Sequence, residues 1–420
     1  MTQPLRHCGL DFGTSNTTLG VADPGAVRLL PLEGDRVTIP STIFFDFSND
    51  TTLFGRAATA AYVSGNDGRM MRSLKSVLGS TLADESTRIK RRVVPFLDII
   101  GGFVGELKSR AQSVLGYELD SVVVGRPAHY VDDDPLADRD AQDQMESAVR
   151  AQGFRHIAFQ FEPIAAALDY EQQVTREELG LVIDLGGGTS DFSVVRVSPE
   201  RAKSTDRSGD ILATSGVHIG GTDFDRLLSL KQAMPALGYQ TPTADGKRPL
   251  PSAPYVDLAT WHRINRLYTP ELLRELRHTQ REARDPNRVA DMISIISHRE
   301  GHRLGGSVED AKIALTADEH AQILFDGEEV TLATPVERKE LSEALAHSVD
   351  RIADTIGLTL AMAGLAADRI ETLILTGGST QIPAIMARLQ TLFPDARFVD
   401  TDAFGSVGLG LALDARRKFG

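Results

Sequence analysis

Cysteine is almost absent from this chain, whose 420 residues include a single one, Cys8. One thiol can form neither an internal disulfide nor a metal site by itself, which excludes a disulfide-stapled secreted domain and favours a reducing compartment. Cys8 precedes an apolar strand pattern, and we interpret it as a core thiol.

Long apolar segments are lacking as well. The chain does not begin with an apolar stretch of signal-peptide length. The longest uncharged, mostly apolar run that we find, residues 357–367, is about half of a transmembrane span. A basic stripe of the kind that grips nucleic acid is also missing, and the formal net charge is −13. We therefore expect a cytoplasmic monomer that binds neither membranes nor nucleic acid.

The composition that is present is that of a globular protein. Hydrophobic residues make up 41% and charged residues 25% of the chain, which excludes general disorder. A chain of 420 residues exceeds one ordinary hydrophobic core, so we expect two or more domains.

An internal sequence repeat indicates how these domains are related. LDFGTSNTTLGV at 10–21 resembles IDLGGGTSDFSVV at 183–195, and both read as a β-hairpin with a Gly-rich tip. The aspartates in the two copies, Asp11 and Asp184, are 173 residues apart, which is the size of a domain. The pattern predicts two lobes of related design.

Other stretches carry weaker signals. Helical spacing at 101–116 ends on Gly116, the acidic stretch 130–140 is predicted to be a solvated loop, and a helix is predicted over 142–153. The segment 238–257 is Pro-rich and is predicted to be a loop.

The region that follows is predicted to be helical and charged from about 258 to 316. Its arginines alternate with glutamates in a way that favours intrahelical ion pairs on a solvated face; they are Arg274, Arg277, Arg281 and Arg284 with Glu271, Glu275 and Glu282. We place Trp261 on the same solvated face. His298 and His302 are four residues apart, but no third metal ligand is evident, and we interpret them as residues of an exposed helix.

Glycine-rich turns are suited to phosphate binding, because glycine lets backbone N–H groups approach a phosphate closely. The first hairpin offers Gly13 with Thr14, Ser15 and Asn16, although Asn16 can equally close the turn. The second offers Gly186, Gly187 and Gly188 with Thr189. A third turn in LTGGSTQIPAI has Gly377, Gly378 and Ser379 before a helix, whose N-terminus favours the ribose and α-phosphate of a nucleotide.

Carboxylates end both apolar strands. Asp11 and Asp184 face one cleft if the lobes oppose, and two carboxylates suit the hydration shell of Mg²⁺. Asp191 can orient a water or a monovalent cation such as K⁺. These motifs together predict an ATP/ADP and Mg²⁺ site.

The three turns as a set resemble the superfamily of actin, sugar kinases and heat-shock 70 (DnaK-type) chaperones, and the resemblance covers nearly the whole chain. It implies an α/β, actin-like (ribonuclease H-like) fold with duplicated lobes around a nucleotide cleft. It also implies lobe I at 1–180, lobe II at 181–405 with a peripheral subdomain at about 223–312, and a last helix at 406–420 that returns to lobe I.

Further segments resemble the chaperone branch and imply residue roles. MRSLKSVLG maps the catalytic lysine to Lys75, which would hold the attacking water, and FEPIAAALDY maps a carboxylate that orients Mg²⁺ waters to Glu162. Thr189 would contact the γ-phosphate, and Asp191 completes the implied catalytic set. The nucleotide contacts implied by the remaining segments are Gly220, Gly221, Glu309, Lys312, Thr316 and Asp402. Ile313 stands where family members usually carry an arginine that stacks on adenine.

The chain ends 18 residues after Asp402. We therefore expect a stand-alone ATPase branch, similar to YegD-like proteins, without a peptide-binding domain. The resemblance implies a slow, Mg²⁺-dependent ATP switch with an unknown protein partner. An actin-like filament protein and a small-molecule kinase of the same fold are the alternatives; a kinase needs a general base facing an acceptor, and Glu162 is the one stand-in we find.

Overall fold

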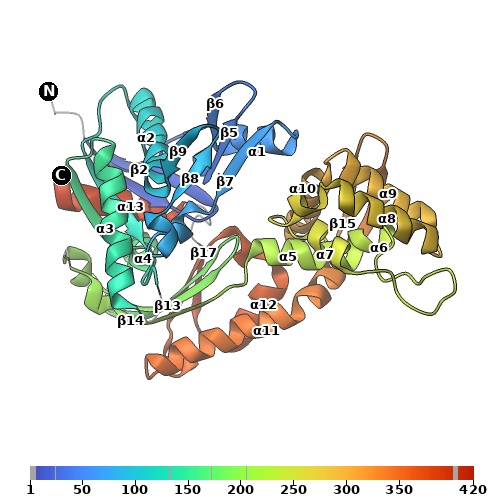
Figure 1. The fold of residues 1–420 in the computed structure, drawn as a ribbon. Coiled ribbons are helices and arrows are strands. Elements are labelled where there is room, and N and C mark those ends of the chain that lie inside the picture. The colour runs from blue at the N-terminus through green and yellow to red at the C-terminus, as the bar shows by residue number, and fades with distance from the viewer. Residues whose placement is uncertain (1–5, 24, 132–133, 172, 205, 401–404) are drawn as a thin grey trace.

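The computed structural model describes residues 6–23, 25–131, 134–171, 173–204, 206–400 and 405–420. Its helices and strands build two large sheets, a peripheral helical region and smaller hairpins (Figure 1). Asp402 lies outside the described residues. Among the described helices, none has both the length and the apolar run needed to cross a bilayer.

The two large sheets have the same topology, as the internal sequence repeat predicts. The first runs in the order β11 (His156–Phe161), β10 (Ser121–Arg126), β1 (His7–Phe12), β2 (Asn16–Asp23), β3 (Ala26–Leu29), with β4 (Thr38–Pro40) also on β2. The second runs β18 (Arg397–Asp400), β17 (Thr372–Thr376), β12 (Glu178–Leu185), β13 (Ser190–Val197), β14 (Ile211–Val217). In each, the first three strands are parallel, and the fourth strand is antiparallel to both the third and the fifth. This duplication confirms the actin-like fold class.

Side-chain alternation decides what each sheet face packs against, because successive strand residues point to opposite faces. On β12, Leu181, Ile183 and Leu185 belong to the outer core of the second sheet, whereas Val182 belongs to a core that faces the first sheet. Each such buried side chain stabilises the fold by about 2 kcal/mol. On β1, Cys8 is fully buried, and burial raises the pKa of its thiol above the usual range, which confirms an inert core cysteine.

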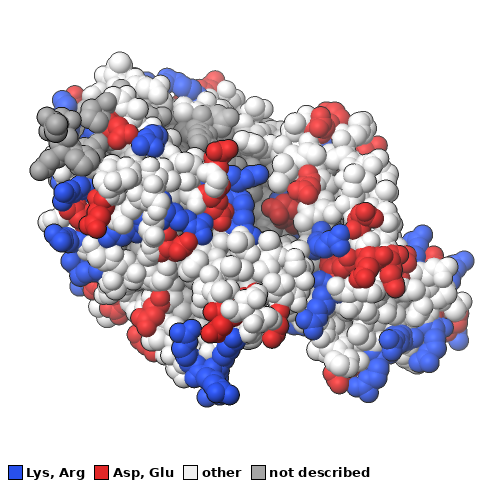
Figure 2. Space-filling view, turned by 90° about the horizontal axis from the view of Figure 1, so that it is seen from above, with Lys and Arg blue, Asp and Glu red and all other residues white. Residues whose placement is uncertain are grey.

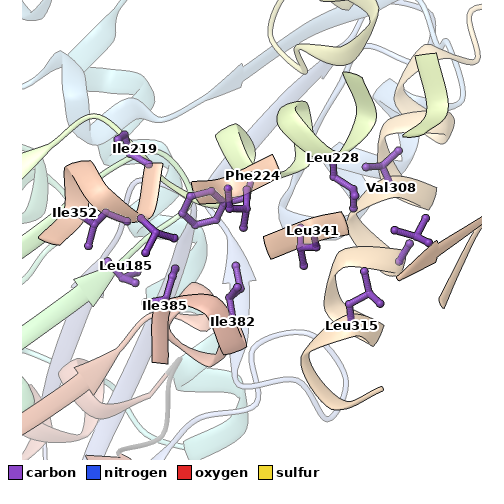
Figure 3. Close-up of a cluster of buried hydrophobic side chains, with 14 of the residues drawn as sticks. Leu185, Ile219, Phe224, Leu228, Val308, Leu315, Leu341, Ile352, Ile382 and Ile385 are labelled. Atoms are coloured by element: carbon purple, nitrogen blue, oxygen red, sulfur yellow. The ribbon is translucent and has the colours of Figure 1, made fainter. Parts of the chain in front are cut away.

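Five layers result. Helices α2 (Phe96–Leu115) and α3 (Pro135–Ala151) cover the outer face of the first sheet, and α11 (Arg338–Met362) and α12 (Pro383–Leu392) cover that of the second (Figure 1). Figure 3 shows Leu185, Ile352 and Ile385 meeting in the second of these cores. Helices α4 (Glu162–Glu171) and α13 (Ser406–Phe419) share the inner core between the sheets.

The last helix lies against the first sheet at glycines. A Cβ atom on Gly9 of β1 would stand 2.3 Å from the backbone carbon of Leu411, and one on Gly410 would stand 1.9 Å from the carbonyl oxygen of Ala165 in α4. No larger residue fits at either position. The domain boundaries predicted above stay a proposal, supported by β12 beginning at Glu178.

The smaller elements surround the two sheets. Around the first are a sheet in the order β6 (Thr51–Phe54), β5 (Thr42–Asp46), β7 (Gly68–Arg72), the helix α1 (Gly55–Val63), and the hairpin β8 (Ser86–Ile89) and β9 (Arg92–Pro95). Beyond the second lie α5 (Gly221–Leu228), a π-helical turn (Ser229–Ala233), α6 (Met234–Ala236), α7 (Ala253–Ala259), α8 (Pro270–Glu282), α9 (Pro286–Ser297), α10 (Gly301–Ala317) and the hairpin β15 (His320–Asp326) and β16 (Thr331–Glu337). Short 3₁₀ turns occupy Leu74–Val77, Thr81–Asp84, Arg201–Lys203, Ser208–Asp210, Ile264–Leu267, Ala367–Arg369 and Gly378–Gln381.

Local predictions were wrong at two places. The helix predicted over 142–153 begins at Pro135, because the Asp134 carboxylate accepts hydrogen bonds from the N–H groups of Leu136 and Ala137 and so caps its first turn. Much of the predicted acidic loop is therefore helical. The predicted loop 238–257 contains the start of α7.

Candidate functional site

The two hairpin tips meet at the floor of a cleft of about 930 Å³. The glycines and hydroxyls predicted on both tips line it, namely Gly13, Thr14, Ser15, Asn16, Gly186, Gly187, Gly188 and Thr189. The tips approach so closely that a Cβ atom on Gly187 would lie 2.3 Å from Ser15 Oγ. A larger residue at position 187 would require the Ser15 side chain to move away from the second tip.

The GGTDFD turn supports the second tip from behind. Gly221 N–H donates to the carbonyl oxygen of Gly186 at 3.0 Å, and Thr222 N–H donates to that of Gly187 at 2.8 Å. A Cβ atom on Gly220 would lie 2.5 Å from Gly188 N. Gly221 lines the cleft, whereas Gly220 packs behind the tip and holds it in place.

Acidic side chains converge below the tips. Asp11 and Asp184 are each the last residue but one of their strands, β1 and β12, and Glu162 opens α4; all three line the cleft. Burial, with the nearby Glu162 carboxylate, raises the pKa of Asp11 to about 7. Burial, followed by the charges of Asp191, Glu162 and Asp11, raises the pKa of Asp184 to about 8.

Lys75 is the cation that faces these carboxylates. It lies in the 3₁₀ turn Leu74–Val77, entered through Ser73 at φ 56°, and its Nζ pairs with Glu162 Oε1. The two side chains are 12% and 16% exposed, so the pair is largely withdrawn from water. Burial lowers the pKa of Lys75, but the charges of Glu162, Tyr130 and Asp11 outweigh it and hold the pKa above its usual range. Lys75 therefore stays charged at neutral pH.

The charge balance of this site fits a divalent cation. The described structure brings Asp11, Asp184 and Glu162 around one lysine, and burial together with the neighbouring carboxylates raises the pKa values of the two aspartates. A hard cation with oxygen ligands relieves such a cluster. Asp191 accepts a hydrogen bond from Thr189 Oγ1 at 3.1 Å and also lines the cleft.

The third Gly turn closes the cleft on the side of lobe II. Gly377 adopts φ +83°, and a Cβ atom there would lie 2.3 Å from the carbonyl oxygen of Leu185. Gly377, Gly378 and Ser379 all line the cleft. The strand β17 ends where β12 ends, so the parallel pairing brings this turn beside the second hairpin tip.

Helix α10 forms the wall above that turn. Glu309, Lys312 and Thr316 line the cleft, and Ile313 is 55% exposed at its rim. Lys312 Nζ lies 2.7 Å from Asp225 Oδ1 of α5. Burial raises the pKa of Asp225 to about 6 despite that lysine. Sequence reasoning missed Asp225 as a cleft residue; the GGTDFD segment that carries it was the available signal.

The mouth of the cleft is bridged by side chains from both lobes. The ring of His302 in α10 lies 4.7 Å from that of Tyr62 in α1 and 4.7 Å from that of Trp261. The Arg72 guanidinium of β7 stands 5.8 Å above the Trp261 ring. We call these four residues the aromatic bridge. Figure 1 shows α1 and β7 facing α10 across this mouth.

The aromatic bridge corrects two predictions. His302 is 3% exposed rather than part of an exposed helix, and Trp261 lines the cleft rather than a solvated face. Burial lowers the pKa of His302 to about 4, so its ring is neutral at pH 7. Nothing in the local sequence signals these contacts, because Tyr62 and Trp261 come from different lobes.

A pH dependence follows from His302. Its pKa is lower in the folded protein than the ordinary value of 6.5, so the unfolded chain binds a proton first as pH falls. Between pH 6.5 and about 4 this residue should lower the free energy of unfolding by about 3 kcal/mol. Chemical denaturation of wild type and His302→Gln across this range measures it. A difference between the two proteins that is independent of pH would contradict this role of His302.

The duplicated sheets and the cleft between them define a two-lobed protein of the actin-like ATPase fold. The family model described as "Hsp70 protein" matches residues 97–232 and 279–416, more than half of the chain. The chain therefore belongs to the Hsp70 family.

Curated relatives agree with this assignment. The chain is 26% identical over 432 aligned residues to "Chaperone protein HscA" of Klebsiella pneumoniae, covering 97% of this chain and 57% of the relative. It is 24% identical to the protein of the same name from Citrobacter koseri, with the same coverage. The chain thus spans little more than half the length of these relatives.

Proposed function

We propose that this chain binds ATP and ADP with Mg²⁺ in the cleft and hydrolyses ATP slowly, as the switch of a chaperone-type cycle. One observation carries the proposal: a largely buried Lys75, paired with Glu162, lines the same cleft as Asp11, Asp184 and two Gly-rich tips. Membership of the Hsp70 family supports it.

The residues divide between binding and rate. Backbone N–H groups of the tips at Gly13–Asn16 and Gly186–Thr189 would hold the phosphates, and Asp11 and Asp184 would hold the waters of the metal ion. Bound Mg²⁺ would neutralise charge on the β- and γ-phosphates. Lys75 would place the attacking water and stabilise charge as the γ-phosphate leaves.

A slow rate follows from the state of the carboxylates. A general base works best when its carboxylate is free to accept a proton at the working pH. Glu162 is already paired with Lys75. The raised pKa of Asp184 keeps its carboxyl group mostly protonated at neutral pH before the metal binds, so it cannot accept a proton. Positioning and charge stabilisation then supply most of the rate acceleration.

Adenine recognition would use the wall formed by α10. Glu309, Lys312 and Thr316 face the cleft from one side of that helix. Lys312 is held by Asp225, which fixes its ammonium group for a ribose hydroxyl. We propose that Ser379 also contacts the nucleotide on this side of the cleft, and that a K⁺ ion binds beside Asp191. A protein partner and a reducing, cytoplasmic setting stay predictions of the sequence.

Single-turnover hydrolysis separates this proposal from its alternatives. With enzyme in excess over γ-labelled ATP and Mg²⁺, the label should appear as inorganic phosphate and the protein should stay in the supernatant on sedimentation. Label transferred to a sugar or carboxylate acceptor would identify a kinase instead. Pelleting that requires ATP would identify a filament protein.

A further inference from the structure

Helix α8 carries a row of arginines on its outer side. Leu276 is buried, and Leu272 and Leu273 pack beside it onto the core, so this side of the helix faces inward. Arg277 and Arg281 lie one turn apart on the other side, and Arg284 follows just after the helix ends at Glu282. All three are exposed. We call Arg277, Arg281 and Arg284 the arginine row.

The arginine row lacks the ion pairs that its sequence predicts. Three nearby carboxylates are engaged elsewhere: Glu271 pairs with Arg274 at 3.0 Å, Glu282 with Arg248 and with His278, and Asp285 with Arg288 at 3.0 Å. Within the described part of the chain, no carboxylate stands at ion-pair distance from any of the three arginines. The sequence prediction holds for Arg274 and is wrong for the row.

The row also lies far from the candidate nucleotide site. Figure 1 places α8 on the outer end of the peripheral helices, and Figure 2 shows Lys and Arg side chains gathered at the outer end of that part of the molecule. None of the three arginines lines the cleft. The three arginines therefore take no part in the proposed hydrolysis of ATP.

We propose that the arginine row is a docking surface for a carboxylate-rich segment of a partner protein. A guanidinium group binds a carboxylate through two parallel hydrogen bonds, which gives arginine rows geometric specificity. Successive turns place Arg277 and Arg281 about 6 Å apart. An acidic helix repeats its carboxylates at the same spacing, and an extended segment does so at every second residue.

The charge of the whole protein favours an acidic protein segment over nucleic acid. The formal net charge of −13 repels a long polyanion, which carries one charge for about every 1.7 Å of duplex. A short segment feels mainly the charges within a Debye length, about 10 Å at 0.1 M salt. The arginine row is also about 10 Å long. It therefore attracts a short acidic segment but is too short to bind an extended nucleic acid.

Fluorescence anisotropy with a labelled glutamate-rich helical peptide tests the proposal on the full chain. The matched peptide with glutamine in place of glutamate serves as the uncharged probe. The glutamate peptide should bind wild type, weaken with added salt and bind the combined variant Arg277→Ala, Arg281→Ala, Arg284→Ala about tenfold or more weakly. Because the three positions are exposed, the melting temperature of the variant should match that of wild type.

A second triple variant controls for net charge. Arg91→Ala, Arg139→Ala and Arg351→Ala removes three exposed arginines from scattered positions and should bind the peptide like wild type. The proposal is overturned if the glutamate peptide does not bind, if the glutamine peptide binds equally well, or if both triple variants lose affinity alike. Tighter binding of a single-stranded oligonucleotide, lost in the row variant, would replace the proposal with a nucleic-acid surface.

Discussion

Replacing Lys75 by alanine should lower the rate of ATP hydrolysis about 100-fold or more and change nucleotide affinity little. The two tips and the metal ion would hold the ground-state nucleotide without this side chain, whereas charge moving on the γ-phosphate would be stabilised by Lys75, the lysine that faces the carboxylates of the cleft. An interaction made mainly in the transition state lowers the rate without weakening binding. Single-turnover rates and ADP titrations measure the two quantities separately.

The surroundings of Lys75 sharpen that experiment. Its removal leaves Glu162 without its partner and adds to the negative charge near Asp11, so Mg²⁺ dependence should be kept or increased. Lys203→Ala, at an exposed position, is the control and should hydrolyse ATP like wild type. An unchanged rate in Lys75→Ala, or a loss of affinity as large as the loss of rate, would contradict the role assigned here.

Replacing Asp184 by asparagine should stabilise the nucleotide-free protein and remove its stabilisation by Mg²⁺-nucleotide. The pKa of Asp184 is raised to about 8, so above pH 8 the folded protein carries a charge that its surroundings oppose. A neutral amide of the same shape relieves this, by about 2 kcal/mol after allowance for the partial exposure of the side chain. The amide cannot hold the waters of Mg²⁺ as a carboxylate does.

The pH dependence gives the sign of the effect. Since the folded-state pKa lies above the ordinary 3.8, the folded protein keeps a proton that the unfolded chain has lost, and the free energy of unfolding falls as pH rises from 3.8 to about 8. The stabilisation by Asp184→Asn should therefore be absent near pH 4 and full near pH 8. Chemical denaturation of nucleotide-free protein at both pH values measures it, with Asp318→Asn at an exposed position as the control. A variant less stable than wild type at pH 8 contradicts this electrostatic account.

The sequence was sufficient for the features that repeat or are locally coded. The repeat between 10–21 and 183–195 predicted two hairpins, and the structure shows the same strand order around both. The helix ending at Gly116 was also predicted, because a residue at φ +75° after a helix favours glycine. Glycines at positions where another part of the backbone packs closely can also be recognised in the sequence, because no other residue is small enough there.

Features that depend on distant partners were not predictable. The aromatic bridge joins Tyr62 to His302, and neither residue has a local pattern that identifies the other. Burial reversed the interpretation of His302 and Trp261, since charged neighbours in sequence made both appear solvated. The early start of α3 depended on one capping carboxylate, that of Asp134, within a run of aspartates.

The most direct test of the central claim is a titration of the wild-type chain with ATP and Mg²⁺, followed by its thermal unfolding. We expect a single site per chain and a stabilisation of about 2.7 kcal/mol when ATP reaches a hundred times its dissociation constant. Most of this stabilisation should disappear when Mg²⁺ is chelated, or when Asp11 is replaced by alanine. A chain whose melting temperature does not move with any adenine nucleotide, with Mg²⁺ present, would contradict the claim that this cleft binds ATP.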